Sequence, residues 1–61
     1  VVGKTLIGQK DFPMCKCEKN GEYEALFYYW YNGEGWYRVK DKNGFMLDIP
    51  DVFLELKPEA A

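Results

Sequence analysis

Turn-forming residues divide this chain of 61 residues into short segments, and they limit its fold more than any other feature. Glycines, prolines and Asn-Gly pairs recur at short intervals, at Gly8, Pro13, Asn20-Gly21, Asn32-Gly33, Asn43-Gly44 and Pro50. Between them the apolar residues alternate with a period of two, and the sequence lacks the helical period of about 3.6 residues. Short strands separated by such turns are typical of a small all-β barrel or sandwich.

The alternation predicts five strands, at residues 4–9, 22–27 or further, 36–40, 45–49 and 53–56. Asn43-Gly44 joins the third and fourth strands, because an Asn-Gly pair between alternating apolar residues is a strong hairpin signal. Residues 10–19 form a longer irregular stretch, and residues 50–52 form a tight 3-10 turn before the last strand. We therefore expect residues 1–61 to be a single all-β domain, a five-stranded, strongly bent and partly open barrel.

The inward-facing positions give the expected core, which consists of Leu6 or Ile7, Cys15, Cys17, Tyr23, Ala25, Val39, Leu47, Ile49 and Leu54. In the second strand, the alternation also places Phe27 on the same face as Tyr23 and Ala25. The opposite face of that strand carries Glu22, Glu24 and Leu26. The predicted strand is thus buried on one side only.

The two cysteines of the chain, Cys15 and Cys17, are separated by one residue. A disulfide across so short a loop would be strained, and two thiolates cannot complete a tetrahedral zinc shell. We interpret both as reduced thiols buried on one face of a strand, where cysteine acts as a small hydrophobic residue. Reduced thiols favour a cytoplasmic location.

The composition excludes several kinds of active site, because the chain contains no histidine and no serine. A Ser-His-Asp triad, a Cys-His pair and a His-ligated metal site are therefore absent. Gly33-Glu34-Gly35 lacks the Lys and Ser/Thr of a phosphate-binding loop, and Asp48 and Asp51 are expected to be solvated. A domain of this size rarely holds a deep pocket. We expect no enzymatic activity, no cofactor and no metal.

The charge of the chain gives no long-range attraction to nucleic acid or to an anionic membrane, since its net value is −2. No apolar run approaches the ~20 residues of a membrane-spanning helix. Bases do follow Trp36 and Tyr37, at Arg38, Lys40 and Lys42, and such aromatic residues could stack on nucleobases. The neighbouring acidic residues would repel phosphate, however, which makes nucleic acid a less favoured partner.

Aromatic residues are concentrated in one part of the chain. Residues 27–31 are all aromatic, and eight of the eleven aromatic residues fall between Tyr23 and Tyr37. A strand that is buried on one face should alternate, so about half of these rings must leave the core. They cover an end of the barrel, form a dimer contact or form a recognition surface, for which Tyr and Trp are well suited.

Five segments resemble the Src-homology-3 (SH3) domain family. Gly35-Trp36-Tyr37-Arg38-Val39 resembles the aromatic pair that opens the third strand of the family, and the Asn43-Gly44 hairpin follows it. The run from Ile49 and Pro50 to Phe53 and Leu54 resembles the Pro-x-x-Tyr-Val motif through the 3-10 turn. Lys19-Asn20-Gly21-Glu22 resembles the start of the second strand, and Met14-Cys15-Lys16-Cys17 stands where the family has Leu-x-Phe. The resemblance spans about residues 4–57, is more specific in its second half, and implies an SH3-like barrel.

The resemblance also implies a ligand groove. It assigns Trp36 as the groove tryptophan, Pro50 as a groove wall and Phe53 as a groove aromatic that lacks the hydroxyl of the family's tyrosine. The Ala-Leu-Tyr-Asp-Tyr motif of the family is missing, because the segment beginning at Lys4-Thr5 stands there. The acidic cluster of the first long loop is reduced to Asp11.

We therefore expect a non-catalytic module that binds a protein or peptide through Trp36, Pro50 and Phe53. Tyr28, Trp30 and Asp11 are expected at the edges of the groove. The expected partner is a segment that contains proline or a basic residue, stacked between rigid aromatic rings.

Other functions remain open at this point. One alternative is a small accessory or inhibitory protein, for example one encoded by a phage, whose aromatic surface forms a homodimer or contacts a host protein. Nucleic-acid binding and cell-wall binding are less favoured. The reduced cysteines count against an extracellular, wall-binding domain.

Overall fold

The computed structural model describes residues 3–58 and shows five antiparallel strands in one sheet. The strands are β1 (Thr5–Gly8), β2 (Glu22–Tyr31), β3 (Glu34–Lys40), β4 (Met46–Pro50) and β5 (Leu54–Leu56). Two 3-10 turns, η1 (Pro13–Cys15) and η2 (Asp51–Phe53), precede β2 and β5. The all-β fold and the 3-10 turn before the last strand are thus confirmed. Within the described residues, no helix has the length and apolar character needed to span a membrane.

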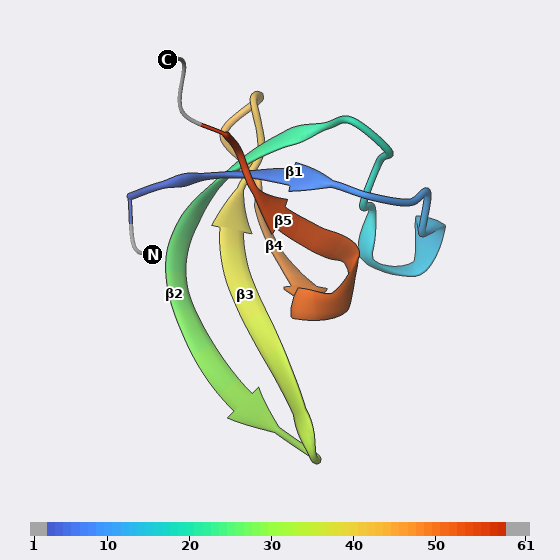
Figure 1. Ribbon diagram of the computed structural model, residues 1–61, viewed down its shortest axis with the longest axis vertical. Helices are drawn as coiled ribbons and strands as arrows, with labels where there is room; N and C mark the ends of the chain where they lie inside the picture. The colour runs from blue at the N-terminus through green and yellow to red at the C-terminus, as the bar shows by residue number, and fades with distance from the viewer. Residues whose placement is uncertain (1–2, 59–61) are drawn as a thin grey trace.

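The sheet has the strand order β4-β3-β2-β1-β5, so β4 and β5 are its edges. Figure 1 shows β1 and β5 crossing the ends of the longer strands β2 and β3. No pairing joins β4 to β5 within residues 3–58, and the sheet is bent and open. The structure therefore supports the five strands and their antiparallel pairing, without closure into a barrel.

β2 and β3 form a long hairpin, the β2–β3 hairpin, which extends away from the rest of the molecule (Figure 1). Asn32 and Gly33 at its tip both have left-handed backbone conformations, with φ of 55° and 79°. This is the pattern of a two-residue type I′ turn, whose twist matches that of the strands. Strand pairing therefore continues up to Tyr31 and Glu34. β2 extends beyond residue 27, as the prediction allowed, and β3 begins at Glu34, two residues earlier than predicted.

The β3–β4 connection is a hairpin, as Asn43-Gly44 predicts, but it has a wider turn. Gly44 donates its backbone N–H to the carbonyl of Asp41 at 3.0 Å. Oδ1 of Asp41 accepts the backbone N–H groups of Asn43 and Phe45, each at 2.9 Å. The Asp41 side chain thus organises the turn, and β4 begins at Met46, one residue later than predicted.

A β-bulge in β2 overturns the prediction for Phe27. Ala25 lies opposite Val39 and Phe27 lies opposite Arg38, so the register shifts by one residue at Leu26. Because strand side chains alternate between the two faces, one extra residue turns every later side chain to the other face. Phe27 is 47% exposed, and its predicted alignment with Ala25 is wrong.

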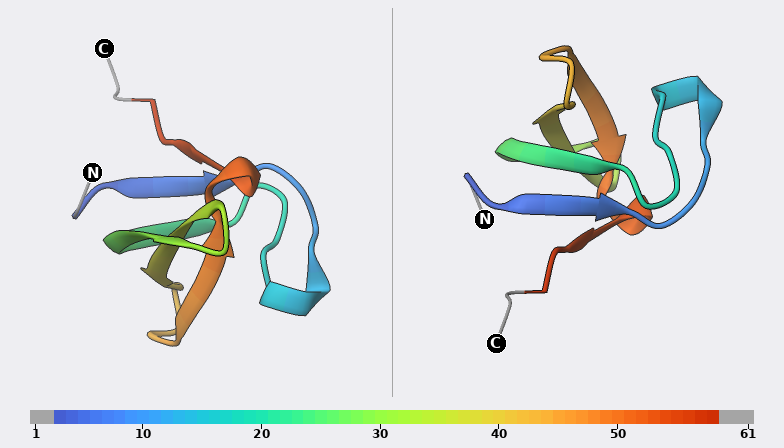
Figure 2. Two further views of the ribbon diagram at one scale, coloured as in Figure 1. Left: turned by 90° about the horizontal axis from the view of Figure 1, so that it is seen from below. Right: turned by 90° about the horizontal axis from the view of Figure 1, so that it is seen from above.

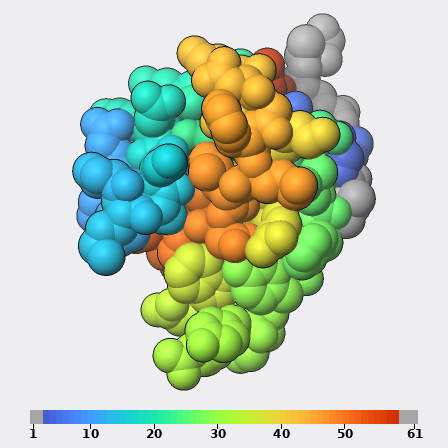
Figure 3. Space-filling model, turned by 180° about the vertical axis from the view of Figure 1, so that it is seen from behind, coloured from blue at the N-terminus to red at the C-terminus, as the bar shows by residue number. Residues whose placement is uncertain are grey.

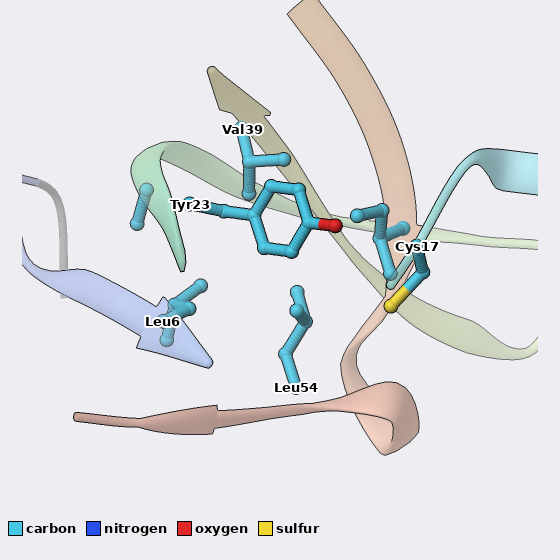
Figure 4. Close-up of a cluster of buried hydrophobic side chains, with 7 residues drawn as sticks. Leu6, Cys17, Tyr23, Val39 and Leu54 are labelled. Carbon is cyan, nitrogen blue, oxygen red and sulfur yellow. The ribbon is translucent and has the colours of Figure 1, made fainter. Parts of the chain in front are cut away.

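Every strand and the loop after η1 contribute to a core of seven buried side chains: Leu6, Cys17, Tyr23, Ala25, Val39, Ile49 and Leu54 (Figure 4). In β1, Leu6 rather than Ile7 faces inward. Cys15 and Leu47 are only partly buried, at the margin of this core. Cys15 belongs to η1, so its prediction as a buried strand residue is wrong, whereas Cys17 is buried as predicted.

Candidate functional site

A folded loop between β1 and β2, residues 9–20, forms one wall of the candidate site; we call it the η1 loop. Phe12 and Cys17 pair across it, with N–H···O distances of 2.8 and 3.1 Å, and η1 lies between them. Lys16 ends η1 with a left-handed backbone, at φ 57°. Figure 2 shows this loop and the β3–β4 ribbon on the same side of β1.

The hydroxyl of Tyr23 fastens the η1 loop to the core. Its ring lies in the core, with the hydroxyl on the side of Cys17 (Figure 4). The hydroxyl accepts the backbone N–H of Glu18 at 2.8 Å and lies 3.4 Å from the carbonyl of Lys16, to which it donates. Buried tyrosines usually pair their hydroxyls in this way, and the two bonds hold the loop in a defined position.

An open groove lies between the η1 loop and the sheet, with a volume of about 680 Å³. Figure 3 looks onto this side of the molecule, where the loop lies beside β4 and the β2–β3 hairpin projects below them. Apolar side chains make up most of its lining: Phe12, Met14, Cys15, Trp36, Met46, Leu47, Pro50, Val52 and Phe53. Its size lies within the range of roughly 300–1,000 Å³ that is common for ligand pockets.

Three of the predicted site residues meet in this groove. Trp36 on β3 lies opposite Pro50 on β4, so the two share one face of the sheet. Phe53, from η2, packs its ring on that of Phe12 with 4.7 Å between ring centres. Nζ of Lys10 lies 5.6 Å from the centre of the Phe53 ring. The groove is therefore built from aromatic and proline surfaces that come from separate elements.

The indole N–H of Trp36 is buried and has no hydrogen-bond partner among the described residues. Leaving a buried donor unpaired costs about 1–3 kcal/mol, so such groups are normally satisfied. Trp36 thus lines the groove with its ring and also carries a buried, unpaired N–H donor.

Three charged side chains line the groove, namely Lys16, Glu34 and Asp48. Asp48 is already bound to Arg38 by two hydrogen bonds of 2.8 and 3.0 Å. This pairing raises the pKa of Arg38 and keeps Asp48 occupied. Glu34, which is exposed, is the carboxylate at the groove that could attract a basic group of a ligand.

The other three predicted site residues lie outside the groove lining. Tyr28 donates a hydrogen bond to Oδ2 of Asp51 at 2.9 Å. Trp30 is 69% exposed and lies near the tip of the β2–β3 hairpin. Oδ1 of Asp11 accepts the backbone N–H of Lys19 at 3.0 Å, which gives this carboxylate a structural partner in the η1 loop.

Sequence reasoning did not assign six of the apolar residues that line the groove: Phe12, Met14, Cys15, Met46, Leu47 and Val52. Met14 and Met46 are 89% and 63% exposed, which is unusual for methionine. Flexible methionines are common at adaptable binding surfaces. The available signal was the Phe-Pro-Met run in an otherwise polar loop, which interrupts the strand pattern.

The groove thiol, Cys15, and the core thiol, Cys17, are unpaired. Burial raises the pKa of both, so they stay protonated at neutral pH and are weak nucleophiles. In residues 3–58, no group of three or more Cys, Asp or Glu side chains is arranged to hold a metal ion. What the groove offers is apolar contact and hydrogen bonding.

The function of this groove has to be inferred from its own chemistry. No family model matches the chain, and neither curated proteins nor solved structures give a significant match. The residues that carry the inference are Trp36, Pro50 and Phe53, together with Phe12 and the exposed methionines around them.

Proposed function

We propose that this protein is a non-catalytic, SH3-like interaction module that binds a polypeptide segment of a partner in the groove. The observation that carries the proposal is the convergence of Trp36, Pro50 and Phe53 on one open, largely apolar groove of about 680 Å³. Such a groove suits an extended segment, because one strip of rigid rings can contact several residues in a row. The two unpaired thiols favour a reducing, cytoplasmic setting for this module.

The proposed ligand is an apolar, proline-bearing segment with a basic residue near one end. A proline-rich segment is already extended in solution and loses little conformational entropy on binding. Two carboxylates line the groove, and one of them, Asp48, is already paired with Arg38. The other, Glu34, is therefore the group that favours a basic residue in the ligand. For a shallow groove of this kind we expect micromolar affinity, about −7 to −8 kcal/mol.

The test uses a peptide of about ten residues with a Pro-x-x-Pro centre and an arginine at one end, measured by calorimetry. Substitution of both prolines by alanine should abolish binding. Trp36→Ala should weaken binding at least ~30-fold, because a central aromatic anchor contributes about 2 kcal/mol or more. Trp36→Phe keeps a ring in place but removes the N–H donor. Its affinity for the peptide should lie between those of the wild type and Trp36→Ala.

Tyr31→Ala is the matched control, since it removes a ring that is 64% exposed and does not line the groove. Its affinity for the peptide should equal that of the wild type. Unchanged binding in Trp36→Ala would overturn the proposal, and so would a loss in Tyr31→Ala as large as that in Trp36→Ala.

A second candidate function is that of a small accessory protein that dimerises or contacts a host protein through the β2–β3 hairpin. The observation in its favour is the exposure of Trp30 and Tyr31 on a hairpin that projects from the molecule. Sedimentation over a range of concentrations tests it: self-association that is lost in Trp30→Ala would favour this function, whereas a concentration-independent monomer would count against a homodimer.

A further inference from the structure

A second, smaller hollow adjoins the groove, between the tip of the β2–β3 hairpin and η2. Its volume is about 220 Å³, and we call it the recess. It shares Glu34, Pro50 and Val52 with the groove but includes neither Trp36 nor any residue of the η1 loop. Its other lining residues are Trp30, Gly33, Gly35 and Asp51.

The recess has a size and a charge that suit one cationic side chain. It lies below the range of roughly 300–1,000 Å³ that is usual for whole ligands. Two of its lining residues, Glu34 and Asp51, are acidic, and none of the seven described lining residues is basic. A positive group is therefore the complementary occupant.

The Asp51 carboxylate is held in place from one side. The Tyr28 hydroxyl donates to its Oδ2 at 2.9 Å, and the Tyr28 ring packs on Tyr37 with 4.9 Å between ring centres. Only one carboxylate oxygen takes part in this bond, so Oδ1 remains for a ligand. The position of the carboxylate is thus fixed before any ligand arrives, which lowers the entropy cost of binding.

At Gly35, β3 has no side chain where the Tyr28 hydroxyl and the Asp51 carboxylate meet. A Cβ at Gly35 would collide with the Tyr28 hydroxyl and with the Asp51 carboxylate. The glycine therefore gives these two groups the space they occupy. Across the recess, the Trp30 ring is 69% exposed and can contact a ligand over its surface.

We propose that the recess binds a single arginine side chain of a partner polypeptide. Its guanidinium stacks on the Trp30 ring and donates hydrogen bonds to Asp51 and Glu34. Arginine fits better than lysine, because a planar guanidinium can stack on an indole and present several donors to carboxylates at once. This site adjoins the groove and shares Glu34, Pro50 and Val52 with it, but it uses neither Trp36 nor the η1 loop, so occupation of one does not require the other.

The probe is N-acetyl-arginine methylamide, added to the 61-residue protein at physiological ionic strength and followed by NMR. It should shift the Trp30 indole signal and the amide signals of Gly33 and Gly35. The citrulline analogue has nearly the same shape without the charge, so it should bind about tenfold more weakly or not at all. The affinity of the lysine analogue should lie between those of the arginine and citrulline compounds.

Asp51→Asn should weaken arginine binding by about tenfold, as loss of a charge-assisted hydrogen bond predicts. Glu24→Gln is the matched control, because it removes one exposed carboxylate of β2 that does not line the recess. It should leave the affinity for arginine unchanged. Trp36→Ala should also leave it unchanged, and this separates a failure of the recess from a failure of the groove.

Three results would overturn the proposal. The first is equal binding of arginine and citrulline. The second is a pattern of shifts centred on Trp36 and Phe53 instead of Trp30. The third is an equal loss of affinity for arginine in Asp51→Asn and Glu24→Gln, which would indicate a general effect of net charge.

Discussion

The hydroxyl of Tyr28 donates a 2.9 Å hydrogen bond to the carboxylate of Asp51, and this bond ties the β2–β3 hairpin to η2. The two residues are 23 positions apart in the chain. The carboxylate raises the pKa of Tyr28, mainly because the hydrogen bond holds the phenolic proton. The titration of Tyr28 therefore reports whether the hairpin and η2 are joined.

Two alanine substitutions in the β2–β3 hairpin should affect different properties. Gly35→Ala should change the pKa of Tyr28, and Gly33→Ala should change the stability of the fold. Gly35→Ala places a methyl group against Tyr28 and Asp51, so it should break their bond and return the Tyr28 pKa toward its ordinary value. Both obstructing groups are side-chain ends that can move, so its stability should change by less than about 1 kcal/mol. Gly33→Ala meets no atom but strains a backbone at φ 79°, and it should cost about 1 kcal/mol.

The measurement is an NMR titration of the tyrosine rings, combined with urea unfolding of both variants. Gly33→Ala should keep the raised pKa of Tyr28 in the folded protein. If Gly35→Ala also keeps it, the carboxylate is not its cause.

Phe12 and Met14 both line the groove but should differ in their effect on stability. Phe12→Ala removes a half-buried ring that packs on Phe53, and it should destabilise the fold by about 1–2 kcal/mol. Met14→Ala removes a side chain that is 89% exposed, so its stability should stay within about 0.5 kcal/mol of the wild type. Urea unfolding measures both, and equal costs would contradict this account of the η1 loop.

Stability should fall at alkaline pH because of Tyr23. Burial raises the pKa of its hydroxyl in the folded state, whereas the unfolded chain releases this proton near pH ~10. The unfolded state therefore loses the proton first, and the free energy of unfolding decreases as the pH rises above about 10. At neutral pH both states are protonated, and the stabilisation is fully present.

Tyr23→Phe tests this explanation. At neutral pH it should cost about 1–3 kcal/mol, because the Glu18 N–H loses its acceptor. The difference from the wild type should shrink as the pH rises above about 10. A constant difference would show that Tyr23 is not the titrating group, and Cys17→Ala would separate the contribution of the buried thiol, whose pKa is also raised.

The two thiols should react with a disulfide reagent at different rates. Cys15 lines the groove and is partly exposed, whereas Cys17 is 2% exposed and must wait for local opening. At mildly alkaline pH we expect one fast and one slow phase, the second at least ~10-fold slower. Cys15→Ser should remove the fast phase, and its persistence would contradict the assignment. A peptide bound in the groove should slow the same phase.

Much of the fold follows from alternation and turn residues. The period of two identifies the buried positions Tyr23, Val39 and Ile49, because each lies in a regular strand with one face inward. The length of β2 could not be read from the sequence, since residues 27–31 are aromatic at every position and carry no alternation. The bulge at Leu26 is equally hidden, because it depends on pairing with β3.

The site was harder to predict than the fold. Trp36, Pro50 and Phe53 could be assigned because the segments around them resemble the groove motifs of the SH3 family. Phe12 could not, since its position depends on how the irregular η1 loop packs on η2. Asp11 was expected at the edge of the groove because the resemblance implies an acidic first loop, yet its carboxylate accepts the backbone N–H of Lys19.

The bulge at Leu26 has a consequence for how this surface can evolve. Ala25 lies opposite Val39 and Phe27 lies opposite Arg38, so loss of the Leu26 codon would leave a regular ladder with the same pairs. Phe27, Tyr29 and Tyr31 would keep their present face of the strand, and Tyr28 and Trp30 would keep the other. The exposed rings depend on the pairing with β3 and not on the presence of the extra residue. A lineage could thus lose Leu26 and retain the same aromatic surface.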